Sequence, residues 1–230
     1  MVEHNTYTLF ELFAFRTSFP GGRHIPLTGA AEVVDLRAFI RESRGDYEGR
    51  GLGQTRFELE DGDDIFIGGF GANLVNGGKG QDILRGGRGD DFLRSEGHGN
   101  LIKGGAGDDT LAILDGSGRL KGGLGDDYLS GTERLEDLGR LSKLTGGQGA
   151  DLFGASGVVK DYDALEGDEI ALIPGAYAVE QVGQDVHISL TQDSSDTHAN
   201  ADGIVMKIRQ SSVDDLVFSE AFPGVELDFI

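Results

Sequence analysis

Aspartates recur in this chain at a constant distance from small groups of glycines. The five clearest cases are nine-residue segments of the form Gly-Gly-x-Gly-x-Asp-x-U-x, where U is a large apolar residue. They are Gly77–Arg85, Gly86–Arg94, Gly104–Ala112, Gly122–Ser130 and Gly146–Gly154. A carboxylate is the hard oxygen ligand that Ca²⁺ prefers, and glycine backbone can turn so that carbonyl groups crowd around a cation. The pattern predicts calcium sites with aspartate at position 6 of each segment.

The gaps between these segments hold weakened copies in the same register. The copies are Arg50–Glu58, Leu59–Ile67, Gly68–Asn76, Ser95–Lys103 and Ile113–Lys121. Residues 50–154 therefore form one repeat domain with a period of nine. A unit this short cannot bury its single apolar residue alone, so the repeats must stack on one another.

The U residues of alternate repeats are predicted to form two columns of the core. One column is Phe57, Val75, Leu93, Leu111, Leu129 and Phe153, and the facing column is Phe66, Leu84, Ile102, Leu120 and Leu144.

The repeats resemble those of the RTX (repeats-in-toxin) proteins of Gram-negative bacteria, which bind calcium and leave the cell by type I secretion. The resemblance implies an all-β fold, a right-handed parallel β-roll that binds several calcium ions. It also implies that the first six residues of each repeat form a turn and the last three a short strand. Two repeats make one coil, so turns 18 residues apart stack on the same side.

Position 6 defines two turn stacks. The first turn stack carries Thr55, Asn73, Asp91, Asp109, Asp127 and Asp151, and the second carries Asp64, Asp82, Asn100 and Gly118. An ion between stacked turns needs a carboxylate from each, so good sites are expected at Asp91/Asp109, Asp109/Asp127, Asp127/Asp151 and Asp64/Asp82. Weaker sites are expected at Asn73/Asp91 and Asp82/Asn100, and none at Asn100/Gly118.

The predicted metal ligands are accordingly carboxylates at position 6 and glycine carbonyls at positions 2 and 4. They are Asp64, Asp82, Gly87, Gly89, Asp91, Gly105, Gly107, Asp109, Gly123, Gly125, Asp127 and Asp151, with Asn73 and Asn100 as weaker ligands. The last two repeats of the first turn stack, which begin at Gly122 and Gly146, are 24 rather than 18 residues apart. We expect the six extra residues near Gly131–Glu136 to bulge out between these turns. Whether a calcium site forms at Asp127/Asp151 is therefore not decided by the sequence.

Composition agrees with a fold that needs counter-ions. The chain has 40 acidic residues against 20 lysines and arginines, a net charge of -20, and 39 glycines. A chain like this repels itself and loses much entropy on folding, so disorder is the alternative in the absence of calcium. It has no cysteine, which excludes disulfide and thiol chemistry.

Two columns of residues are predicted to face outward. An apolar one at position 7 is Leu74, Phe92, Thr110, Tyr128 and Leu152, which we expect a terminal segment to cover. A basic one at position 9 is Arg85, Lys103 and Lys121, with Arg119 beside it. This basic column is either a solvated face neutralised by the acidic turns or a surface for an anionic polysaccharide. The repeat modules of alginate epimerases, which the roll also resembles, are a precedent for the second interpretation.

Residues 1–49 are expected to cap the first coil. The apolar run Tyr7–Phe15 predicts a strand, and Glu32–Glu42 predicts a short helix. The run is not typical of a secretory signal peptide, because it lacks a basic flank and contains Glu11. No run of eighteen apolar residues that could span a membrane occurs.

Residues 155–230 are expected to form a β-rich cap. Val158–Leu172 resembles the closing segment of RTX proteins, and short strands are predicted within Val179–Leu190, Gly203–Arg209 and Leu216–Phe218 around a loop at Thr191–Asp202. Glu226–Ile230, an acidic residue followed by apolar ones, resembles an uncleaved type I secretion signal. The expected location is extracellular, and the expected partner is the type I secretion machinery.

Whether the chain is an enzyme stays open, with a non-catalytic role favoured. It lacks a His-Glu-x-x-His zinc motif and a Gly-x-Ser-x-Gly elbow. The first hypothesis is a secreted, calcium-dependent surface, matrix or glycan-binding protein; no nucleic acid is expected as a partner. The alternatives are a small polysaccharide hydrolase or lyase, whose site would join the two terminal segments, and a detached repeat module of such an enzyme.

Overall fold

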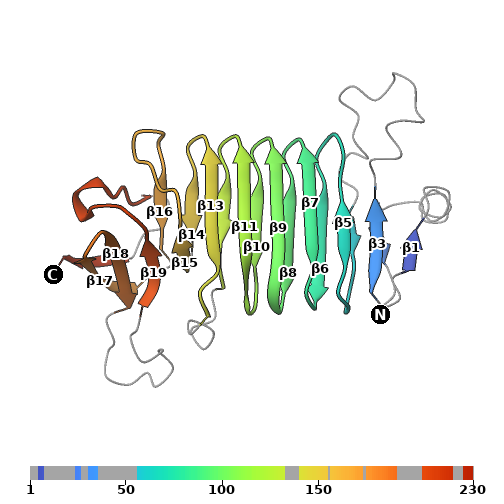
Figure 1. The fold of residues 1–230 in the computed structure, drawn as a ribbon, viewed down its shortest axis with the longest axis horizontal. Helices are drawn as coiled ribbons and strands as arrows, with labels where there is room; N and C mark the ends of the chain where they lie inside the picture. Colours follow the sequence, from blue (N-terminus) through green and yellow to red (C-terminus); the bar gives the residue numbers. More distant parts are fainter. Residues whose placement is uncertain are drawn as a thin grey trace.

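A computed structural model describes residues 5–7, 24–26, 31–35, 56–132, 140–154, 156–172, 175–190, 204–219 and 225–229 of the chain. These residues form two sheets that face each other along an elongated roll (Figure 1). The parallel β-roll expected from the repeats is thereby confirmed.

The first sheet has twelve strands. In spatial order they are β1 (Asn5–Tyr7), β3 (Glu32–Asp35), β5 (Ile65–Ile67), β7 (Ile83–Arg88), β9 (His98–Ala106), β11 (Ser117–Leu124), β13 (Lys143–Gln148), β15 (Gly157–Val159), β19 (Ile204–Ile208), β18 (Asp185–Leu190), β17 (Gly175–Val182) and β20 (Val225–Phe229).

The second sheet has eight strands. In spatial order they are β16 (Glu169–Ala171), β14 (Leu152–Gly154), β12 (Tyr128–Ser130), β10 (Thr110–Ile113), β8 (Phe92–Glu96), β6 (Leu74–Lys79), β4 (Arg56–Glu58) and β2 (His24–Pro26). The chain alternates between the sheets, so each coil adds one parallel strand to each of them.

The two predicted core columns are confirmed. In the eight-stranded sheet Leu93 pairs in register with Val75 and Leu111, and in the twelve-stranded sheet Ile102 pairs with Leu84 and Leu120. Every U residue of both columns is fully buried. Like side chains therefore stack from coil to coil, and their burial drives the stacking of repeats that are otherwise rich in glycine.

Strands β4, β5, β12 and β14 have the predicted three residues, whereas β6 to β11 and β13 are longer. Strand β7 continues from Arg85 across Gly86 and Gly87 to Arg88, and Gly87 stays in register with Gly105 of β9. The parallel ladder thus includes positions 1 to 3 of the next repeat, and the turn proper shrinks to positions 4 to 6. Glycine permits this because its backbone follows the ladder at positive φ, which is 116° at Gly87.

The helix predicted over Glu32–Glu42 is wrong where the structure describes it. Residues Glu32–Asp35 form β3, which pairs in parallel with β5 and places Val34 beside Phe66 in the core column. The ladder of the neighbouring coil outweighs the local helical spacing of the apolar residues. Of the predicted strand Tyr7–Phe15, Tyr7 ends β1, and the rest lies outside the described residues.

The C-terminal part continues the ladders and then changes direction. Val159 pairs with Leu144 and Ile208, and Ile170 pairs with Phe153, so both core columns gain further members. Strands β17 and β18 form an antiparallel hairpin that covers the predicted Val179–Leu190 segment but begins earlier, at Gly175, and β19 lies within Gly203–Arg209.

Two other C-terminal predictions have different outcomes. Leu216–Phe218 is not a strand: it follows a short 3₁₀ turn at Val213–Asp215, and only Phe218 makes an isolated bridge, to Ile170. Most of the predicted Thr191–Asp202 loop lies outside the described residues.

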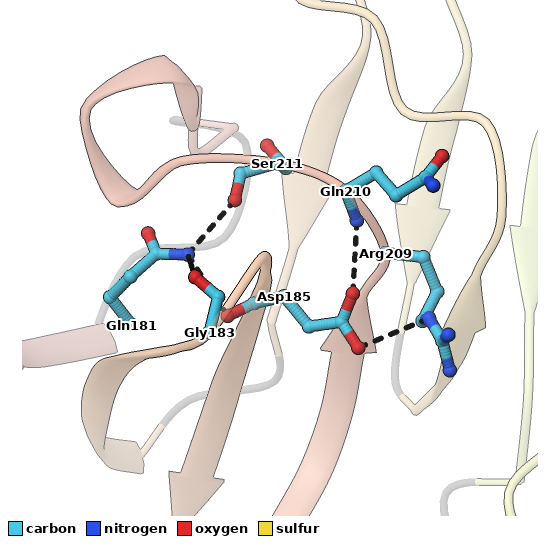
Figure 2. Close-up of polar contacts among 6 residues, drawn as sticks. All are labelled: Gln181, Gly183, Asp185, Arg209, Gln210 and Ser211. Carbon is cyan, nitrogen blue, oxygen red and sulfur yellow. Dashed lines mark hydrogen bonds and ion pairs between the residues drawn. The ribbon is translucent and has the colours of Figure 1, made fainter.

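A polar cluster fixes the hairpin turn against the end of β19 (Figure 2). Asp185 accepts the backbone N–H of Gln210 at 3.0 Å and pairs with Arg209 Nε at 3.1 Å. Gln181 Nε2 donates to the carbonyl oxygens of Asp185 and Ser211, both at 3.1 Å. These contacts join β17, the beginning of β18 and the residues that follow β19, where β18 pairs with both other strands in antiparallel orientation.

The described strands of the two terminal segments lie at opposite ends of the twelve-stranded sheet, β1 and β3 at one and β17 to β20 at the other (Figure 1). A site that joins the two segments is therefore not formed by the residues that the structure describes.

Candidate calcium sites in the stacked turns

The glycines at positions 2 and 4 let consecutive turns approach closely. A Cβ on Gly105 would lie 2.2 Å from the carbonyl oxygen of Gly87 in the preceding coil. One on Gly125 would lie 2.4 Å from the carbonyl oxygen of Gly107. Both glycines have positive φ, so a side chain would be excluded by space and by backbone conformation. The predicted ligand carbonyls of these turns are thus stacked in line.

The position-6 aspartates of the first turn stack form a continuous ladder. Oδ1 of Asp109 accepts the backbone N–H of Asp91 at 2.8 Å, and Oδ1 of Asp127 accepts that of Asp109 at 2.8 Å. Oδ1 of Asp151 accepts the backbone N–H of Asp127 at 3.0 Å. Each carboxylate therefore bridges its own coil to the preceding one through a single oxygen.

The second oxygen of these carboxylates has no such bond. Oδ2 of Asp91, Asp109 and Asp127 is buried and meets no hydrogen-bond partner among the described residues. Each Oδ2 points at the first glycine of its own repeat; a Cβ on Gly104 would be 2.0 Å from Oδ2 of Asp109. A buried carboxylate oxygen without a partner destabilises the fold unless a proton or a cation joins it.

The pKa values of the row follow from this burial. Desolvation raises the pKa of Asp91 to about 6 and those of Asp109, Asp127 and Asp151 to about 7. Neighbouring carboxylates, such as Asp91 and Asp108 near Asp109, raise the pKa further, while the backbone N–H bonds lower it. The metal-free turns are therefore poised to exchange protons for cations near neutral pH.

The donor set fits calcium better than a transition metal. Within the described ranges, no three acidic or histidine side chains converge on one point. A cation between two turns would therefore be held by two carboxylates and by backbone carbonyls, all hard oxygen ligands. The residues that would hold it are the position-6 aspartates and the glycines at positions 2 and 4 of the flanking turns.

The insertion between Gly122 and Gly146 leaves this row intact. Tyr128 of β12 pairs in register with Leu152 of β14, and the bond from Asp127 to Asp151 matches those of the regular coils. The extra residues fall between β12 and β13, which is the second turn stack, on the other side of the roll. Most of the predicted bulge near Gly131–Glu136 lies outside the described residues, and the turns of Asp127 and Asp151 stack as those of the regular coils do.

Asn73 ends the row with an amide in place of a carboxylate. Its Nδ2 donates to Oδ1 of Asp91 at 2.7 Å and to the carbonyl oxygens of Gly71 at 3.0 Å and Gly86 at 3.3 Å. Acceptors of this kind are the ones a calcium ion would use. The amide thus satisfies them without a metal, which is a physical reason for the weak site predicted at Asn73/Asp91.

The second turn stack is less regular. Asp82 accepts the backbone N–H of Asp64 at 3.0 Å, as in the first stack, but its Oδ2 accepts the hydroxyl of Ser95. Desolvation raises the pKa of Asp82 to about 6. Asn100 donates through Nδ2 to the carbonyl oxygens of Glu96 and Gly97, and Gly118 donates its N–H to the hydroxyl of Ser142. The Asp64/Asp82 and Asp82/Asn100 sites stay predictions.

Sequence reasoning missed a second row of carboxylates, at position 5. Asp90 accepts the backbone N–H of Asp108, Asp108 accepts that of Asp126, and Asp126 accepts that of Ala150, at 2.8–3.0 Å. The carboxylates of this exposed row accept backbone N–H groups of the following coil, whereas those of the buried row accept backbone N–H groups of the preceding coil. The Asp-Asp doublets of the repeats were the signal that could have revealed it.

The buried row also extends beyond the repeats. Oδ1 of Asp168 accepts the backbone N–H of Asp151 at 2.9 Å, and its Oδ2 accepts that of Asp163 at 2.8 Å. Burial raises the pKa of Asp168. The Asp-x-U triplet at Asp168–Ile170 could have indicated this position, because Asp168 directly precedes β16 as Asp151 directly precedes β14.

The basic column lies on the outer face of the twelve-stranded sheet. Lys103 pairs in register with Arg85 and Lys121, and Arg119 pairs with Lys143 of the next strand. No ion pair of these five cations is formed within the part of the chain that the structure describes. Parallel strands are about 4.8 Å apart, so the charges repel one another in the absence of an anion.

The apolar column lies on the outer face of the eight-stranded sheet, in the predicted register from Leu74 through Phe92 and Thr110 to Tyr128 and Leu152. Phe92 is 39% exposed. The terminal strands that the structure describes lengthen the sheets and do not lie over this column. Its covering by a terminal segment stays a prediction.

Comparison with known families identifies the repeats. The model of the RTX calcium-binding nonapeptide repeat matches four copies, at residues 60–93, 97–112 and 114–133. No curated protein matches the chain significantly. No helix among the described residues is long and apolar enough to cross a membrane. With its roll, its buried aspartate row and these matches, the chain contains RTX calcium-binding nonapeptide repeats, a family of repeats that binds Ca²⁺ at several sites.

Proposed function

We propose that the protein is an extracellular binding module that folds on calcium after export by a type I secretion machinery. The observation that carries this proposal is the buried row of Asp91, Asp109 and Asp127, whose Oδ2 atoms have no partner in the described part of the chain. Proteins with RTX repeats are typically secreted by Gram-negative bacteria, which supports the same conclusion.

The free energy of calcium binding is large enough for the calcium concentration to decide whether the chain is folded or unfolded. Extracellular calcium modules have dissociation constants of about 10⁻⁴–10⁻³ M. At a tenfold excess of calcium over that constant, each site adds about 1.4 kcal/mol to the unfolding free energy. Three sites between Asp91 and Asp151 would add about 4 kcal/mol, against a typical domain stability of about 5–15 kcal/mol.

The same row disfavours folding inside the cell. Cytosolic calcium sensors work at about 10⁻⁷–10⁻⁵ M, well below the constants of extracellular modules. At such concentrations the carboxylates of the stack would repel one another and remain desolvated in the folded state. An unfolded chain is the form that a narrow export channel requires.

The ligand that we propose is an anionic polysaccharide on the basic column. Arg85, Lys103 and Lys121 present a row of like charges that forms no ion pair among the described residues, and of the three Lys121 interacts electrostatically with the carboxylate of Asp161. The opposite location of the described terminal strands, β1 and β3 against β17 to β20, favours a binding module over a polysaccharide-acting enzyme with a site between the terminal segments. A detached module of a separate enzyme is compatible with the same surface.

Two measurements test the proposal. A circular dichroism titration should show little β signal in chelator and a cooperative gain with calcium at millimolar concentrations. A folded chain in chelator would contradict calcium-driven folding. In calcium, Lys103→Glu should weaken binding to acidic oligosaccharides and reduce its salt dependence, while equal binding by both proteins would reject the basic column as the ligand surface.

A further inference from the structure

The second turn stack contains a groove of about 470 Å³ at the beginning of strands β7, β9, β11 and β13. One of its walls is formed by the position-5 residues of successive coils, among them Gln81, Gly99 and Ser117. In the first turn stack the same position carries Asp90 and Asp108, whose carboxylates bridge the coils. The groove therefore lies where the repeat loses its outer carboxylates.

The floor of the groove changes from apolar to basic along the roll axis. Its position-7 residues are Ile83 and Leu101, followed by Arg119 and Lys143 on the next two strands. Arg119 and Lys143 are direct register partners, both are exposed, and neither forms an ion pair with a described residue. Two cations about 4.8 Å apart repel each other unless an anion lies between or across them.

The basic column continues this charge on the same face. Lys121 is two residues beyond Arg119 on β11, so both side chains point outward from the sheet, about 7 Å apart along the strand. A ligand along the roll axis would thus meet Arg119 and Lys143 in the groove and Lys103 and Lys121 beside it. Asp82, at the other end of the groove, is fully buried and bonded to Ser95, so its carboxylate is not presented to a ligand.

The lining is suited to sugars rather than to nucleic acid bases. Its uncharged part consists of amide, hydroxyl and glycine backbone groups and of aliphatic side chains, and no aromatic residue occurs among the described lining residues. Single-stranded nucleic acids rely on aromatic side chains for base stacking.

We propose that this groove binds a linear acidic polysaccharide along the roll axis, with Arg119 and Lys143 contacting its carboxylate or sulfate groups. This inference rests on the proposed glycan-binding function and assigns its specificity to the groove. It also explains why position 5 of the second turn stack carries Gln81, Gly99 and Ser117 in place of aspartate: a carboxylate there would face the ligand.

The test uses the full chain in saturating calcium and short oligosaccharides of galacturonic acid and of sulfated galactosamine. The double variant Arg119→Gln/Lys143→Gln should raise the Kd of at least one of the two acidic oligosaccharides about tenfold. Ser117→Asp, which restores the position-5 carboxylate of the regular repeat, should weaken binding to a similar extent. Arg94→Gln, on the outer face of the other sheet, is the matched control and should leave the Kd unchanged.

The outcomes separate the groove from the broader function. If neither oligosaccharide binds the wild-type protein, the proposed glycan-binding function itself fails. If Lys103→Glu abolishes binding but the groove variants bind as the wild type does, the groove assignment is overturned and the proposed function survives. Equally tight, Arg119-dependent binding of a single-stranded oligonucleotide would overturn the choice of a polysaccharide. Circular dichroism in calcium verifies that each variant is folded.

Discussion

The backbone N–H of Asp109 donates to Oδ1 of Asp127 at 2.8 Å, while Oδ2 of the same carboxylate is buried without a hydrogen-bond partner in the described part of the chain. One oxygen thus holds two coils together and the other needs a cation or a proton. Asp91 and Asp109 repeat this relationship one coil earlier. The contacts between the coils and the proposed calcium sites consequently reside in the same side chains.

Asp109→Asn should reduce the calcium stoichiometry and shift the calcium midpoint of folding upward. The substitution removes a charge from two neighbouring sites but retains a side chain that can accept the N–H of Asp91. Isothermal titration calorimetry and circular dichroism measure the two effects. Asp108→Asn is the matched control, because Asp108 is exposed and belongs to the outer row. Identical stoichiometry in wild type and Asp109→Asn would show that position 6 does not bind the ion.

Asn73→Asp should have the opposite effect and create one further site. The amide of Asn73 now donates to Asp91 and to two carbonyl oxygens, whereas a carboxylate would repel these acceptors unless a cation joined them. We expect one more calcium ion per chain in native mass spectrometry and lower stability in chelator. An unchanged ion count with undiminished stability would show that the amide does not replace a cation.

The calcium-free protein should become less stable as the pH rises from about 4 to about 7. Asp109, Asp127 and Asp151 have pKa values of about 7 in the fold against an ordinary value of 3.8, so the folded state binds more protons than the unfolded state over this interval. The unfolding free energy therefore falls with pH, and it reaches its low plateau above a pH of about 7.

The β signal in circular dichroism, measured in chelator at pH 5 and pH 8, checks this dependence and should be larger at pH 5. Calcium should bind more weakly at pH 6 than at pH 8 and should release protons, which calorimetry in buffers of different ionisation enthalpy detects. Higher stability at pH 8 than at pH 5 in chelator would contradict the assignment.

Gly122→Ala should destabilise the roll by about 1–3 kcal/mol and weaken calcium binding. A Cβ on Gly122 would lie 2.0 Å from Oδ2 of Asp127, so the carboxylate would have to turn away from its bond with Asp109. Gly183→Asn serves as the control, because nothing lies within 4 Å of a Cβ there and asparagine tolerates the positive φ of 67°. Unfolding monitored in calcium should shift for Gly122→Ala and remain close to wild type for the control.

Gln181→Ala should loosen the C-terminal hairpin without affecting the roll. The side chain of Gln181 donates to Asp185 and Ser211 and accepts the N–H of Val213 at 3.0 Å (Figure 2 shows the donated bonds). Its loss should cost about 1 kcal/mol and increase amide exchange in β17 to β19. The calcium midpoint should not change; a shift would show that this cluster and the calcium turns fold as one unit.

The repeat alone determined the architecture and the core of this protein. A period of nine with one apolar residue per unit requires the units to stack, and the two-repeat coil that the resemblance to RTX proteins implies then places residues such as Leu93 and Ile102 in their columns and beside their neighbours. The same period placed Asp91, Asp109 and Asp127 in one row, since side chains 18 residues apart stack.

Only the tertiary structure decided how each side chain of that row is used. The sequence does not distinguish the oxygen of Asp127 that bridges two coils from the one that lacks a partner, because this depends on how closely the Gly122 turn approaches. The role of Asn73 depends likewise on three acceptors from different coils. Glu32–Asp35 form a strand because they pair in parallel with the edge of β5. This pairing joins residues about 30 positions apart, which no local pattern encodes.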